Sequence, residues 1–122
     1  MINNKIADFI TRLNTANKLQ KSLIIVPKSN DIISILNIIN HHASNILSFI
    51  ILDSTIHIHL KNQFRFIKLL STNSRRRFIS VNQLRTLDRG LGFYILRTSE
   101  GLLSSFEAKK RNIAGELILL FK

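Results

Sequence analysis

Apolar residues recur every three or four positions near the start of the chain, from Ile6 to Leu13. This spacing places them on one face of a helix and predicts a helix over residues 5–16. Asn3 or Asn4 would cap its first turn, because a short polar side chain can accept a hydrogen bond from the free backbone amides there. The pattern therefore begins with an amphipathic helix.

The rest of the first half alternates apolar runs with a second helical stripe. Residues 22–26 are typical of a strand that Pro27 ends, and Ser29 suits the N-cap of the helix that follows. Residues 47–52 and 55–60 form two further apolar runs separated by two polar residues, as in a β-hairpin. The order predicted for this half is α-β-α-β-β.

Shorter apolar runs follow in the second half. The predicted strands cover residues 66–70, 93–97 and 115–121, and the predicted helices cover 81–87 and the stretch from a Ser104 or Ser105 cap to Arg111. The last strand is apolar on both faces, so it should lie inside its sheet. The fold class is α+β, with two small packed subdomains: 1–65, and 66–122, the latter mostly β with short helices.

Charge is the abnormal feature of the composition. The 122 residues include 18 Lys and Arg against 7 Asp and Glu, a net charge of +11. So basic a small protein usually meets phosphate, in nucleic acid or at an anionic membrane, although charge can also serve solubility alone. Residues 66–122 carry 11 basic and 4 acidic groups (+7), and residues 1–65 carry 7 and 3 (+4), so the second half is the better candidate for binding anions.

Catalytic, metal and cofactor sites find little support. The chain has no cysteine and no run close to the ~18 apolar residues of a membrane span. His57 and His59 share the outward face of a strand, but zinc needs further ligands, and His41-His42 more simply meets a helix C-terminus. Gly90-Leu91-Gly92 lacks the third glycine of a dinucleotide fingerprint, and Ser99 has no histidine base in its half. We expect no enzyme, metal or cofactor.

Arg75, Arg76 and Arg77 form a basic run directly before Phe78. Such runs are often only a solvated surface. Alternatively, Phe78 anchors the loop to the core and holds the guanidinium groups where they can contact phosphates. The sequence leaves both interpretations open.

A polar segment, Arg97-Thr98-Ser99-Glu100-Gly101, interrupts the apolar pattern between two strands. One interpretation is a tight turn, which Gly101 would suit. The other is a binding surface, because hydroxyls can bond phosphates, 2′-hydroxyls and base edges, and glycine lets a ligand backbone approach closely. Flanking strands would hold these groups in place, so the segment indicates a site for folded RNA.

The C-terminal run GLGFYILRTSEGLLSSFEAKKRNIAGELILLF resembles the signature of the eighth small-subunit ribosomal protein family, bacterial type. The family pattern is Gly-x-Gly, an apolar strand, Ser-Thr-Ser-x-Gly, a helix with Glu-Ala, then Gly-Gly-Glu and an apolar strand. Upstream, IADFITRLNTA, LIIVPKS and LLSTNSRRRFI resemble the family's first helix, its strand with proline and helix cap, and its basic loop. The resemblance covers almost the whole chain.

This resemblance implies a structural component of the ribosomal small subunit. Such a protein binds the central domain of small-subunit ribosomal RNA directly, helps its assembly and meets neighbouring small-subunit proteins. The implied RNA contacts are Thr98, Ser99, Gly101 and Glu116, with Thr11, Arg12 and Ser29 as secondary contacts.

Several residues depart from the family pattern, and two of them lie in the polar segment. Arg97 stands where the family usually has serine, and Glu100 stands where it often has lysine. The planar guanidinium of Arg97 would either reach an RNA phosphate or pair with Glu100. Arg97 and the three arginines of the basic run complete the expected RNA-binding surface.

The composition also bears on location. The chain has 20 Ile and 12 Asn but only 4 Gly and 1 Pro, which indicates an A/T-rich genome. With no presequence apparent, we expect a mitochondrial ribosome, with a plastid or a bacterial cytoplasm as the alternative. The competing function is a basic surface-binding module for a membrane or protein partner outside the ribosome, although the sequence offers no strongly cationic amphipathic helix.

Overall fold

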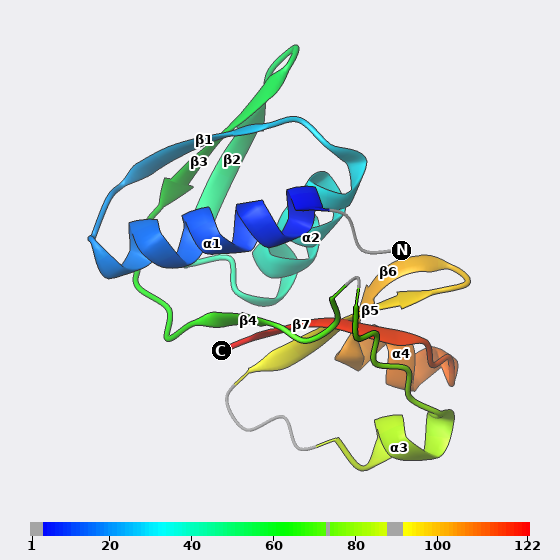
Figure 1. Cartoon of the computed structure of the whole chain (residues 1–122). Helices are drawn as coiled ribbons and strands as arrows, with labels where there is room; N and C mark the ends of the chain where they lie inside the picture. Colours follow the sequence, from blue (N-terminus) through cyan, green and yellow to red (C-terminus); the bar gives the residue numbers. More distant parts are fainter. Residues whose placement is uncertain (1–3, 73, 88–91) are drawn as a thin grey trace. The chain divides into compact units, whose positions relative to one another are not determined.

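A computed structural model of the chain describes residues 4–72, 74–87 and 92–122 (Figure 1). The chain contains two compact units, Asn4–Phe66 and Ile67–Lys122. Both combine helices with an antiparallel sheet, which confirms the α+β fold class. The predicted cap residue Asn3 and the Gly90-Leu91 pair lie outside the described residues.

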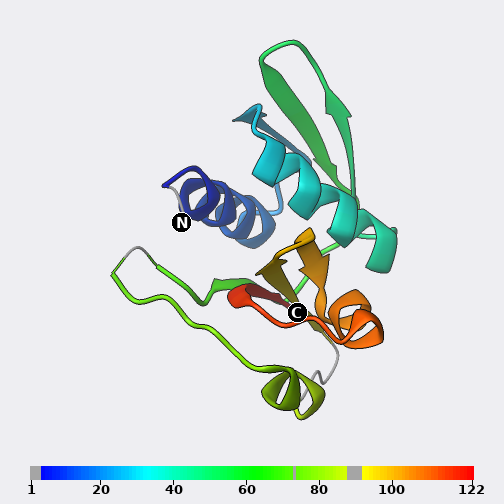
Figure 2. The same ribbon diagram turned by 90° about the vertical axis from the view of Figure 1, so that its right-hand side faces the viewer.

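The first unit has the predicted order α-β-α-β-β. Its three strands form one antiparallel sheet in the order β1-β3-β2, and Figure 2 shows the two helices side by side. The elements are α1 (Asn4–Lys18), β1 (Leu23–Pro27), α2 (Asn30–His42), β2 (Leu47–Ile51) and β3 (Thr55–Leu60). The hairpin predicted between residues 47 and 60 is confirmed.

The apolar stripes of the sequence make the core of this unit. Ile6 and Leu13 of α1 and Ile35 of α2 are fully buried, as are Ile56 and Ile58 on the inward face of β3. Burying such side chains stabilises the unit by roughly 1.5–3 kcal/mol each. The core therefore follows from the periodicity.

The histidines lie partly as expected. His57 is half-buried and His59 exposed, on the face of β3 opposite the buried isoleucines. His41 and His42 do not follow α2 but form part of its last turn, because the helix continues past its apolar stripe. Ser29 is the N-cap of α2, as predicted, although its side chain makes no capping hydrogen bond.

The second unit is built on a four-stranded sheet in the order β4-β7-β5-β6. Its elements are β4 (Ile67–Leu69), α3 (Val81–Arg85), β5 (Phe93–Thr98), β6 (Gly101–Ser104), α4 (Ser105–Arg111) and β7 (Glu116–Phe121). The closing strand β7 lies between β4 and β5, which confirms its predicted interior position. The apolar pattern did not predict a separate strand for β6.

Serine caps position the two short helices against this sheet. Ser104 is the N-cap of α4 and accepts a hydrogen bond from the backbone N–H of Glu107, as predicted. Ser80 forms a capping box with Gln83 at the start of α3. The helices then pack on the sheet through a cluster of buried side chains. These are Leu84, Leu96, Ala108 and Leu117.

Candidate nucleic-acid interface

The polar segment between β5 and β6 is a tight hairpin turn with Ser99 and Glu100 at its tip. Thr98 pairs with Gly101 across the hairpin, and its Oγ1 donates to the Gly101 carbonyl (2.8 Å) and accepts from the Glu100 N–H (3.1 Å). Gly101 has a φ of +93°, which side chains rarely adopt. The turn interpretation is therefore correct, and the Thr98 hydroxyl serves the turn itself.

The outer side of this turn is open. Ser99 is exposed, and its hydroxyl has no partner among the described residues. An ideal Cβ built on Gly101 would meet nothing within 4 Å, so the glycine presents free space. A tight turn and a binding surface are compatible at this position.

Glu100 is tied to helix α4 through Arg111. The Nη1 atom of Arg111 lies 3.0 Å from Glu100 Oε1, and its Nε lies 3.7 Å from Glu107 Oε2. The ion pair observed for Glu100 is thus with Arg111, whereas the sequence suggested Arg97 as an alternative partner. The two carboxylates share one guanidinium, which offsets one of their two negative charges.

A row of four residues crosses the sheet beside the turn. Phe78 bridges Glu116, Glu116 pairs with Arg97, and Arg97 pairs with Leu102. Gly115 allows this close approach, because a Cβ there would lie 2.2 Å from the Arg97 carbonyl oxygen. Partners directly opposite on antiparallel strands project to the same face, so the row places Arg97 and Glu116 together.

Glu116 is buried at the start of β7 and held by Arg76. Its side chain is 2% exposed, and Arg76 donates from Nε to Oε2 (3.1 Å) and from Nη2 to Oε1 (3.0 Å). This bidentate hydrogen bonding lowers the pKa of the Glu116 carboxyl and raises the pKa of the Arg76 guanidinium, because it stabilises the charged form of each group. Arg76 also lies over the ring of Phe78, 5.3 Å from its centroid.

Hydrogen bonds attach both ends of the basic loop, at Ser71 and Arg77, to Leu117 of β7. Ser71 is fully buried, donates from Oγ to the Leu117 carbonyl (2.5 Å) and accepts from the Arg77 N–H (2.9 Å). The Leu117 N–H donates in turn to the Arg77 carbonyl (2.8 Å). Arg75 and Arg77, which flank Arg76 in the chain, are exposed. The loop is therefore held by polar contacts and by Arg76, while Phe78 is itself 64% exposed.

The secondary residues belong to the unit Asn4–Phe66. Thr11 donates from Oγ1 to the Ala7 carbonyl (3.0 Å) within α1. Arg12 donates to the Ile25 carbonyl (3.2 Å) and lies 3.3 Å from Asp8. Both side chains are exposed, so their outer atoms remain accessible.

Three anchors of the second unit were missed from the sequence: Ser71, the Arg76–Glu116 pair and the Glu100–Arg111 pair. Within residues 4–72, 74–87 and 92–122, no group of three or more His, Asp or Glu side chains could hold a metal ion. No helix in that part of the chain is long and apolar enough to cross a bilayer.

Comparisons with a family model and with individual proteins point to the same family. Residues 4–121 match the family model of ribosomal protein S8. The small ribosomal subunit protein uS8c of Helicosporidium sp. subsp. Simulium jonesii is 35% identical, over 94% of this chain and 93% of its own length. The uS8 protein of Orientia tsutsugamushi (strain Boryong) is 30% identical over 96% of both chains, and that of Mycoplasmopsis agalactiae is 31% identical over 96% and 95%. The chain thus belongs to the ribosomal protein S8 family and is a structural protein of the small ribosomal subunit, active in translation and not an enzyme.

Proposed function

We propose that this protein binds the central domain of small-subunit ribosomal RNA directly and helps that domain to assemble beside neighbouring small-subunit proteins. The observation that carries the proposal is the polar scaffold of the second unit. It fixes the open hydroxyl turn between β5 and β6 and a loop, hydrogen-bonded to β7, that carries two exposed arginines. Family membership and the net charge of +7 on residues 66–122 support it.

The turn offers contacts that suit folded RNA. The Ser99 hydroxyl can donate to or accept from a phosphate, a 2′-hydroxyl or a base edge. Gly101 leaves room for a ribose-phosphate backbone to approach. The internal bonds of Thr98 fix the turn, so little conformational entropy is lost on binding.

The basic loop offers the phosphate contacts. Arg75 and Arg77 are exposed, and the loop that carries them is fixed by Ser71 and by Arg76. Fixed guanidinium groups bind phosphate oxygens in a bidentate manner and release condensed counterions. Arg76 is then a positioning residue, and Glu116 contributes through Arg76.

The acidic side chains that the structure describes in this unit are partly offset by neighbouring cations. Glu100 and Glu107 lie against Arg111, and Glu116 lies against Arg76. Each of these carboxylates has a cation beside it, and Glu100 and Glu107 share theirs. The exposed Arg75 and Arg77 are left to face a polyanion. Arg97 stays a predicted contact, half-buried at the base of the turn.

Direct binding tests the proposal. The full chain would be titrated into a transcript of the rRNA central domain, with an unrelated structured RNA of equal length as the control. We expect a saturable one-to-one complex that survives an excess of the control RNA. Equal affinity for both RNAs would overturn the proposal, since charge alone binds any RNA.

We also propose that the ribosome in question is mitochondrial. The A/T-biased composition supports an organellar gene, and the relatives named above include an organellar protein of the plastid type as well as bacterial ones. Fractionation of the source cells tests this. The protein should sediment with the small subunit of mitochondrial ribosomes, and sedimentation with plastid or cytoplasmic ribosomes alone would overturn it.

A further inference from the structure

The unit Asn4–Phe66 carries a polar trough where α1 and β3 end. Two hollows, of about 380 and 430 Å³, share Asn17 and Gln63 and so adjoin one another. We call them the amide trough, after the side chains that matter below. These are Asn17, Gln20, Lys21, Leu60, Lys61 and Gln63.

The walls of the amide trough are fixed by internal hydrogen bonds. The Asn17 side chain donates from Nδ2 to the Phe64 carbonyl (2.6 Å) and accepts at Oδ1 from the Phe64 N–H (3.2 Å). The Lys21 N–H donates to the Ala16 carbonyl (2.9 Å), and the Lys61 N–H to the Ile46 carbonyl (2.7 Å). The backbone on either side is therefore preorganised, and its shape does not depend on a ligand.

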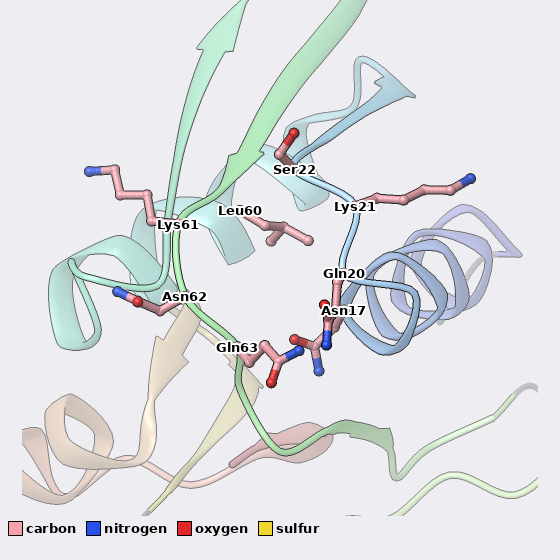
Figure 3. A pocket seen from close by; sticks show the side chains of 8 residues that line it. All are labelled: Asn17, Gln20, Lys21, Ser22, Leu60, Lys61, Asn62 and Gln63. Carbon is pink, nitrogen blue, oxygen red and sulfur yellow. The ribbon is translucent and has the colours of Figure 1, made fainter.

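Two amides on this wall have unused bonding capacity. Among the residues that the structure describes, no hydrogen bond occupies the side chain of Gln20 or Gln63. Figure 3 shows their amide groups close to that of Asn17 on one side of the hollow, with Leu60 pointing into the space from β3. Each free amide offers two donors and an acceptor, which matches the edge of a nucleobase.

The charge of the amide trough favours a polyanion. Lys21 and Lys61 extend on opposite sides of the hollow in Figure 3, and Lys18 and Arg65 line the second hollow. None of the described residues that line either hollow is acidic. A negatively charged chain could therefore run through the trough with a cation on each side.

We propose that the amide trough binds an unpaired RNA nucleotide together with the phosphates on both sides of it. The free edge of the base bonds the amides of Gln20 and Gln63, Leu60 makes the apolar contact, and Lys21 and Lys61 take the flanking phosphates. The base must be unpaired, because pairing covers the edge that the amides read. The inference rests on the proposed function, since it gives the protein a second RNA contact apart from the hairpin turn.

The test uses the full chain and a labelled single-stranded RNA of eight mixed nucleotides, followed by fluorescence anisotropy over a salt series. Replacing both glutamines (Gln20→Ala with Gln63→Ala) should weaken binding roughly three- to tenfold. The matched control removes two exposed amides from α2 (Asn37→Ala with Asn40→Ala) and should leave the affinity unchanged. Equal losses in both variants would overturn the proposal.

The lysines are tested in the same assay. Lys21→Gln with Lys61→Gln should reduce the magnitude of the log–log salt slope by roughly 1.4, at about 0.7 for each lost phosphate contact to a single strand. Lys5→Gln with Lys28→Gln, two exposed cations outside the trough, serves as the charge-matched control. An unchanged slope in the first pair, or equal slopes in both pairs, contradicts the site.

Competitors distinguish RNA from other anions. Unlabelled single-stranded RNA should displace the probe, while a duplex of the same length or a polyglutamate peptide should displace it at least tenfold less well. Equal displacement by the peptide would show a general anion surface and overturn the proposal. Ser44→Ala, an exposed serine outside both proposed surfaces, should leave binding of the short probe unchanged. The trough is scored on the short single strand and the hairpin surface on the central-domain transcript, so a failure of one is seen separately from a failure of the other.

Discussion

Arg76 and Glu116 stand 40 positions apart in the chain and form a bidentate ion pair in which the carboxylate is 2% exposed. The pair joins the basic loop to the first residue of the interior strand β7. The two residues meet where the basic loop contacts β7, through the Phe78–Glu116 bridge and the hydrogen bond from the Leu117 N–H to the Arg77 carbonyl. The pair therefore depends on the tertiary structure. The pair thereby holds in place the loop backbone that carries the exposed Arg75 and Arg77.

The stability that this pair adds should depend on pH. The pKa of Glu116 is lowered from its ordinary value of 4.5, so the folded state binds a proton less readily than the unfolded state. The resulting stability is fully present above about pH 4.5 and is lost as the pH falls through the lower folded-state pKa. Glu116→Gln should cost on the order of 1–3 kcal/mol at neutral pH.

Urea unfolding of the wild type and the Glu116→Gln protein, measured from neutral pH down to about pH 3, checks this prediction. The difference in free energy of unfolding should shrink as the medium becomes more acidic. A constant difference across the whole series would contradict the assigned role of the carboxylate.

Gly115 and Gly101 should respond differently to alanine. At Gly115 the new Cβ would lie 2.2 Å from the Arg97 carbonyl oxygen, so the strands must move apart, at roughly 1–3 kcal/mol or more. At Gly101 there is open space, and the cost comes only from the φ of +93°, about 1 kcal/mol. Thermal and urea unfolding of both variants should give the larger loss for Gly115→Ala, and the reverse order would refute the close strand approach.

Ser99 and Thr98 should separate RNA binding from stability. Ser99→Ala removes an exposed hydroxyl and should weaken binding to the central-domain transcript roughly fivefold or more without changing the melting temperature. Thr98→Val removes both hydrogen bonds of the turn and should lower the stability by about 1 kcal/mol. Ser44→Ala, at an exposed serine of the other unit, is the control. An undiminished affinity in folded Ser99→Ala would exclude the serine as a contact.

The elements that were predicted correctly are those with a local signal. The stripe from Ile6 to Leu13 marks α1, and the apolar run of β7 indicates an interior strand. The ends of the helices were predicted less accurately. The helix α1 extends to Lys18, and α2 includes His41-His42, so both continue beyond their apolar stripes. Helix ends depend on capping and local bonds that periodicity does not record.

The candidate site was predicted only in part for a similar reason. The turn at Ser99 and Gly101 is a local feature, and its hydroxyls and glycine are visible in the sequence. The partner of Arg76 lies 40 residues away and the buried bond of Ser71 to Leu117 spans 46, so neither has a local signature. Likewise, Glu100 meets Arg111 because α4 returns past the turn, a contact that spacing alone does not specify.

A salt series on the central-domain transcript tests whether the basic loop of the unit Ile67–Lys122 binds ribosomal RNA. The variants are Arg75→Gln with Arg77→Gln and, as the charge-matched control, Lys5→Gln with Lys28→Gln. We expect the magnitude of the log–log salt slope to fall by roughly 1.4–1.8 for the arginine pair and to change little for the lysine pair. An arginine variant that keeps the wild-type affinity and slope, or a lysine variant that loses as much, would contradict it.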